Sequence, residues 1–213
     1  MGIGRTGRVV AALIGGLVLA GLWLQGLDVW RTRFEDPTLA GVVWYLVRYF
    51  TILTNAMIVG TMALVAAGRR VAPGWLAGLV LWILIVGLVY HLLLSGGAHT
   101  PVGWWADLLL HTVSPVAVPL WWALAAPTAG PGLGTAAAWL LWPALYCGYA
   151  LARGLWDGVF PYFFLDPSRL GWGGVLGWIG ILLAVFALGA LAVLGIGRWL
   201  ARREERRAAP TAT

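Results

Sequence analysis

The sequence contains few charged residues and no lysine. Only 10% of its 213 residues are charged, and all 14 basic residues are arginines. A soluble domain carries about 25% charged residues, so this chain cannot cover a water-exposed surface of ordinary composition. Without lysine, Schiff-base chemistry with retinal or pyridoxal phosphate is excluded. The single cysteine, Cys147, excludes an intrachain disulfide and a thiolate metal cluster, and we expect it to be a small packing residue.

Apolar residues are abundant instead. The chain is 61% hydrophobic, with 15 tryptophans and a mean hydropathy of +0.87. Because a membrane-spanning helix needs about 20 apolar residues, this composition predicts an all-α, polytopic bundle of six transmembrane helices. We expect one domain over residues 1–201 and a charged, disordered tail over 202–213. The predicted helices are Val9–Val29, Val43–Ala67, Trp75–Leu94, Trp104–Ala125, Ala136–Arg153 and Trp172–Leu200.

The arginines predict the orientation of this bundle. If both termini lie in the cytoplasm, nine arginines fall on the cytoplasmic side and four on the opposite side. The positive-inside rule therefore favours an N-in, C-in topology for a multi-pass protein of the cell membrane. An arginine-only composition rich in Gly, Ala and Trp is typical of a GC-rich bacterium. We expect membrane lipids as partners and no nucleic acid, and the sequence leaves the oligomeric state open.

In this topology, polar residues of three predicted helices lie at one level, in the outer half of the membrane. Arg48, Thr51 and Asn55 have i, i+3, i+7 spacing, which places them on one stripe of the second helix. Asp107 and His111 lie one turn apart on the fourth helix. Polar groups at this depth are expected to face the bundle interior. The same level holds His91 and Ser114, and the last outer loop above it carries Arg153, Asp157, Tyr162 and Asp166.

These residue types supply the parts of nucleophilic acyl transfer. A hydroxyl needs a nearby base, and that base needs an orienting acceptor, roles that Thr51, His111 and Asp107 can fill. Arg48 or Asn55 could then stabilise an oxyanion. This chemistry requires neither a metal nor another cofactor. We further expect His91 and Tyr162 to contact substrate, whereas Ser114, directly before Pro115, is interpreted as structural.

Three other functions are compatible with the same residues. Asp107, His111 and His91 offer one carboxylate and two imidazoles, the ligand types of a catalytic zinc. Arg48, Asp107 and His111 could instead line a proton or anion path in a small transporter or channel. The inner halves of the second to fifth predicted helices hold no acidic or basic residue, which argues against a path through the whole membrane. The last alternative is a non-catalytic lipid-binding protein.

Three segments also carry a resemblance to a known family. They are Arg48–Asn55 (RYFTILTN), Asp107–Pro115 (DLLLHTVSP) and Phe160–Asp166 (FPYFFLD). In this order they resemble the androgen-induced and androgen-dependent integral membrane proteins and their bacterial six-helix relatives. Members of that family are intramembrane threonine hydrolases that cleave fatty acid esters of hydroxy fatty acids. The resemblance implies that Thr51 is the nucleophile and His111 the catalytic histidine, whereas the animal proteins have Asn in place of Asp107.

Overall fold

The computed structural model describes residues 3–96, 100–126 and 131–208, and every regular element in these ranges is a helix. The first helix is α1 (Arg5–Thr32), and the chain then forms α2 (Leu39–Leu46), α3 (Phe50–Ala66) and α4 (Pro73–Val89), which continues into the π-helical turn η1 (Tyr90–Leu94). The next span consists of α5 (Pro101–Leu108), the π-helical turn η2 (Leu109–Val113) and α6 (Ser114–Ala125). The remaining elements are α7 (Leu133–Ala138), α8 (Leu141–Asp157), the 3-10 turn η3 (Phe163–Leu165) and α9 (Pro167–Ala208).

Within the described residues, four helical segments are long and apolar enough to cross a membrane: Arg5–Thr32, Pro73–Leu94, Pro101–Ala125 and Pro167–Arg203. A fifth is the bent pair α2 and α3, if these two helices form one broken span. Leucine and tryptophan side chains are exposed along the outside of these helices, as a lipid-facing surface requires. The molecule is therefore an all-helical bundle consistent with a membrane protein. The expected fifth span is divided between α7 and α8, so six spans and their orientation stay predictions.

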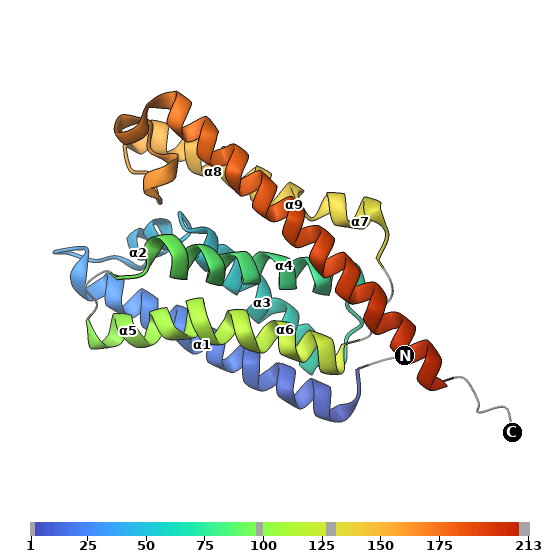
Figure 1. Cartoon of the computed structure of the whole chain (residues 1–213). Helices are drawn as coiled ribbons and strands as arrows, with labels where there is room; N and C mark the ends of the chain where they lie inside the picture. The colour runs from blue at the N-terminus through green and yellow to red at the C-terminus, as the bar shows by residue number, and fades with distance from the viewer. Residues whose placement is uncertain (1–2, 97–99, 127–130, 209–213) are drawn as a thin grey trace, which may run out of the picture.

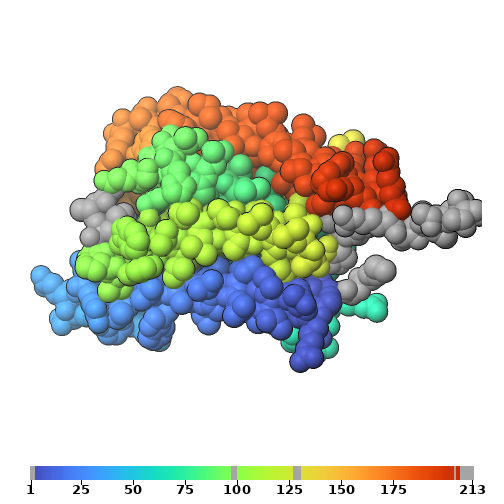
Figure 2. All heavy atoms as spheres, turned by 60° about the horizontal axis from the view of Figure 1, so that its bottom comes forward, coloured from blue at the N-terminus to red at the C-terminus, as the bar shows by residue number. Residues whose placement is uncertain are grey.

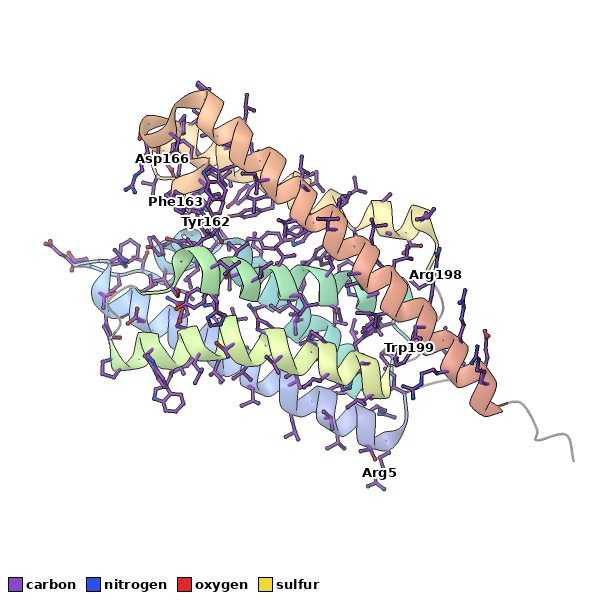
Figure 3. The ribbon with its side chains drawn as sticks, in the orientation of Figure 1. Arg5, Tyr162, Phe163, Asp166, Arg198 and Trp199 are labelled. Carbon is purple, nitrogen blue, oxygen red and sulfur yellow. The ribbon has the colours of Figure 1, made fainter. Side chains whose placement is uncertain are left out.

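The helices pack as neighbouring layers. In Figure 1, α1 lies beside α5 and α6, and α4 lies between this pair and α9, which crosses the bundle obliquely. Figure 2 shows the same succession of α1, α5–α6, α4 and α9 on one face of the molecule. The termini of the described chain mark one end of the bundle: Arg5 and Arg198 lie there, whereas Tyr162, Phe163 and Asp166 lie at the other end (Figure 3).

The predicted helix Val43–Ala67 is not continuous, which corrects the sequence analysis. The chain breaks at residues 47–49, and α2 meets α3 at an angle of 102°. Tyrosines from the α8 region bind the backbone groups that the break releases. Tyr146 donates to the carbonyl of Arg48 (2.8 Å), Tyr149 to the carbonyl of Val47 (3.3 Å), and Tyr162 accepts from the N–H of Phe50 (3.1 Å). These bonds make the break tolerable in an apolar surrounding.

The last helix extends beyond the predicted range Trp172–Leu200 at both ends, because α9 begins at Pro167 and ends at Ala208. Asp166 precedes it, and its carboxylate accepts the N–H (2.9 Å) and the hydroxyl (2.6 Å) of Ser168, bonds that hold the pKa of this carboxyl below its usual value. Gly171 has φ +65°, which separates the first turn from the main helix. At the other end α9 is helical to Ala208, so residues 202–208 are not the irregular tail that was expected, and 209–213 lie outside the described residues.

Candidate functional site

The predicted nucleophile and base come together at the end of the bundle away from the termini. Nε2 of His111 lies 3.2 Å from the hydroxyl of Thr51, across the contact between η2 and α3. On the other side of the ring, Nδ1 lies 2.9 Å from Oδ1 of Asp107, a close contact that is not aligned as a straight hydrogen bond. Thr51, His111 and Asp107 therefore form a hydroxyl–imidazole–carboxylate series in the order that nucleophilic catalysis requires.

A proline accounts for the local shape that presents His111. Pro115 has no N–H, so the carbonyl of His111 has no donor at the position four residues later. The helix widens into η2 at this point, and such π-helical turns are common at functional sites. Gly87 lets α4 approach closely here, because a Cβ on it would lie only 2.8 Å from Cβ of Pro115.

Tyr90 joins the site, although the sequence analysis did not select it. Its ring stacks on His111, with centroids 4.1 Å apart and planes inclined by 20°. Its hydroxyl donates to Oδ2 of Asp107, the carboxylate oxygen that does not face His111. Tyr90 thus holds both the imidazole and the carboxylate. The only feature of the sequence that could have identified Tyr90 as a site residue is its position directly before His91, on the helix that faces His111.

His91 points elsewhere. Its Nε2 lies 3.2 Å from the hydroxyl of Thr112, and it is absent from the wall of the cavity around His111. The structure consequently does not bring His91, Asp107 and His111 together as ligands of one ion. In the described part of the chain, no three His, Cys, Asp or Glu side chains are grouped so that they could hold a metal.

Arg48 is also separated from the Thr51–His111–Asp107 series. Because the chain breaks beside it, its guanidinium turns to Asp157, with bonds of 3.0 and 2.8 Å to the two carboxylate oxygens, and to the carbonyl of Val159. Arg153 shares Asp157 at 3.5 Å and lies over the ring of Trp44, 3.9 Å from its centroid. The structure thus places Arg48 in an ion-pair cluster that ties the start of α3 to the end of α8, not beside the Thr51 hydroxyl.

Asn55 and Ser114 both lie outside the cavity walls. The Asn55 amide donates to the carbonyl of Thr51 (2.9 Å) and to that of Leu110 (3.4 Å), which links α3 to η2. Both of its donors are used in this way, so the structure does not offer Asn55 as an oxyanion donor. Ser114 is fully buried and its hydroxyl has no hydrogen-bond partner among the described residues.

Tyr162, which the sequence analysis expects to contact substrate, lies beside Thr51. The phenol bonds the N–H of Phe50 and the side chain of Thr51, and it lines both cavities described below. Burial raises the pKa of the Tyr162 phenol, so it stays protonated at neutral pH. A neutral phenol at this position can donate a hydrogen bond to an oxygen that becomes negative near Thr51.

Two cavities meet at Thr51. One, of about 640 Å³, is polar and contains His111, Asp107, Asp28 and Arg33 in its wall. The other, of about 250 Å³, is lined by apolar side chains of α4, α8, η3 and α9, among them Val86, Phe164 and Phe186. Thr51, Tyr90, Leu94 and Tyr162 belong to both walls.

The apolar cavity is accessible from the side of the bundle. Ala144 and Gly148 of α8 and Leu183 of α9 line it and are themselves exposed. In a membrane, this side faces the hydrocarbon chains of the lipids. An acyl chain can therefore enter the apolar cavity while the polar part of the same molecule occupies the polar cavity, with its junction beside Thr51.

Comparison of the chain with protein-family models, with curated proteins and with solved structures finds no match. The family resemblance accordingly stays an expectation drawn from the three sequence segments, and the functional argument depends on the geometry of the site.

Proposed function

We propose that the protein is an intramembrane lipid ester hydrolase in which Thr51 is the nucleophile and His111 its general base. The observation that carries the proposal is the Thr51–His111–Asp107 series at the junction of an apolar and a polar cavity. The substrates are acyl esters, such as the fatty acid esters of hydroxy fatty acids that the resemblance implies. With both termini in the cytoplasm, the site lies in the outer leaflet.

In the proposed first step, the Thr51 oxygen attacks the ester carbonyl carbon and His111 takes the hydroxyl proton. Asp107 stabilises the imidazolium, and Tyr162 donates to the carbonyl oxygen as it becomes negative. The ester C–O bond then breaks, and the leaving alkoxide takes the proton from His111. Water hydrolyses the acyl-threonine with His111 again acting as the base. A small rotation of the ring would align Nδ1 with Asp107 when substrate is bound.

The test is labelling with a fluorophosphonate together with hydrolysis of a decanoyl ester by purified protein. We expect wild type and Thr51→Ser to be labelled at residue 51 and to hydrolyse the ester, and Thr51→Ala to do neither. Thr54→Ala is the matched control, because Thr54 is a buried α3 hydroxyl that accepts from Trp142 (3.2 Å) and lines neither cavity. Full activity in Thr51→Ala would overturn the proposal.

Asp107→Asn separates a hydrolase from a transporter. An amide oxygen can still accept from His111, so the variant should hydrolyse ester more slowly than wild type but faster than His111→Ala. In a proton path, by contrast, loss of the titrating carboxylate would be the most damaging of these changes and Thr51→Ala would matter little. Washing with a chelator should leave hydrolysis unchanged, whereas loss of turnover with release of one zinc per chain would favour a metal hydrolase.

A further inference from the structure

The wall of the polar cavity contains a second carboxylate, away from the reacting groups. Asp28 of α1 lies against the first turn of α5, where a Cβ on Gly103 would be 3.1 Å from its carboxyl carbon. The hydroxyl of Thr100 donates to Oδ1 of Asp28. Among the described residues, no hydrogen bond reaches Oδ2, and the side chain forms part of the cavity wall. Asp28 therefore offers an acceptor to whatever occupies this cavity.

The charges around the cavity indicate what that occupant is. Its wall holds two carboxylates, Asp28 and Asp107, against one guanidinium, that of Arg33. Among the described residues of the wall, the carboxylates therefore outnumber the guanidinium by one. A phosphate or a carboxylate in the cavity would meet repulsion at close range, and its desolvation would not be repaid. An occupant with hydroxyl donors can instead bond the free carboxylate oxygen.

A cationic head group fits less well than a neutral one. Tyr45 and Tyr49 line the cavity, and rings of this kind often bind a quaternary ammonium. Here, however, the guanidinium of Arg33 already lies 6.0 Å from the centroid of Tyr45. A second cation at these rings would lie beside Arg33 and be repelled by it.

We infer that the polar cavity selects esters whose alcohol part is a neutral polyol, such as glycerol, with Asp28 as the residue that recognises its hydroxyl groups. The inference rests on the proposed hydrolase function and narrows its substrate class: among acyl esters it favours polyol esters over the esters of hydroxy fatty acids that the resemblance implies. The acyl chain would lie in the apolar cavity, the ester at Thr51, and the remaining hydroxyl groups of the alcohol at Asp28. A site that bonds a substrate hydroxyl discriminates strongly against analogues without it.

The experiment compares five decanoyl esters that differ only in the alcohol: glycerol, ethanol, glycerol phosphate, choline and a hydroxy fatty acid. We expect kcat/KM for the glycerol ester to exceed that for each other ester by about tenfold or more. In Asp28→Asn, the amide oxygen can still accept from Thr100. This variant should reduce the ratio of kcat/KM for the glycerol ester to that for the ethanol ester by about tenfold. His91→Gln, a change outside the cavity wall, should leave this ratio unaltered.

Several results would overturn the inference while leaving the hydrolase intact. One is Thr51-dependent hydrolysis that is as fast for the phosphate, choline or hydroxy-acid ester as for the glycerol ester. Another is a ratio of kcat/KM for the glycerol ester to that for the ethanol ester that does not change in Asp28→Asn. Absence of hydrolysis of all five esters would instead reject the hydrolase itself. Thermal stabilisation of Thr51→Ala by the intact esters gives a readout that needs no turnover: the glycerol ester should raise Tm most, and a larger rise with the phosphate ester contradicts the inference.

Discussion

Arg48 and Thr51 are three residues apart in the chain but belong to clusters of opposite kinds. The terminal nitrogens of Arg48 bind Asp157 and the carbonyl of Val159, and its side chain is almost completely buried. This cluster is closed, because the guanidinium groups of its two arginines bind Asp157 and backbone carbonyls between the start of α3 and the end of α8. The Thr51 hydroxyl faces His111 and borders two cavities, so its cluster is open to a ligand. Closed polar clusters hold helices together, whereas open ones are available for chemistry.

The largest expected effect separates His111, which belongs to the open cluster, from His91, which lies outside it. His111→Ala should lower kcat/KM for a decanoyl ester by about a thousandfold or more, because the hydroxyl loses its base. His91→Ala should change it by less than about threefold, since His91 contacts Thr112 outside the cavity wall. Steady-state kinetics with Tm as a folding control measures both. Equal losses in the two variants would contradict the assignment.

Breaking the closed cluster should chiefly affect stability. Arg48→Met leaves Asp157 with its longer contact to Arg153 and the N–H of Val159, and we expect a loss of about 3 kcal/mol in the free energy of unfolding. Arg169→Met is the control, because Arg169 pairs with Asp166 on the surface and its removal should hardly change stability. Denaturation in mild detergent gives both values. A fully stable Arg48→Met protein would show that the cluster is not what holds α3 to α8.

A smaller effect should sharpen the description of the open cluster. Tyr90→Phe keeps the ring stacked on His111 but removes the hydrogen bond to Asp107, so kcat/KM should fall about tenfold. Tyr149→Phe also removes a bonded hydroxyl, which accepts from the guanidinium of Arg153 and donates to the carbonyl of Val47. This variant should nevertheless leave kcat/KM nearly unchanged. If Tyr90→Phe has full activity, then Tyr90 acts only through its ring.

The smallest effect concerns a polar residue that belongs to neither cluster. Ser114→Ala removes a buried hydroxyl that has no partner among the described residues, so stability should stay the same or rise by about 1 kcal/mol. The ester kinetics should not change. Thermal unfolding and the same decanoyl assay are sufficient to measure this. A clear loss of activity would reveal a role for Ser114 that its position does not indicate.

The sequence by itself determined the membrane-type helical fold and much of the candidate site. Apolar runs of about 20 residues favour long helices, and α1, α4, the α5–α6 span and α9 coincide with predicted helices within several residues. The i, i+4 spacing of Asp107 and His111 survives in the structure because it lies within one helical segment. The choice of Thr51 was possible for a similar reason, since its depth in the bundle follows from the order of the helices.

Only the tertiary structure decided which polar residues share a cluster. Helical spacing assigns Arg48 to the stripe of Thr51 only if the helix is continuous, and the break at residues 47–49 is stabilised by tyrosines about a hundred residues away. The selection of Tyr90 over His91 depends likewise on how closely α4 approaches α6 at Gly87. The two cavities are formed by side chains from several helices. Periodicity describes one helix at a time, whereas rotation, breaks and cavities depend on contacts between helices, which no local pattern contains.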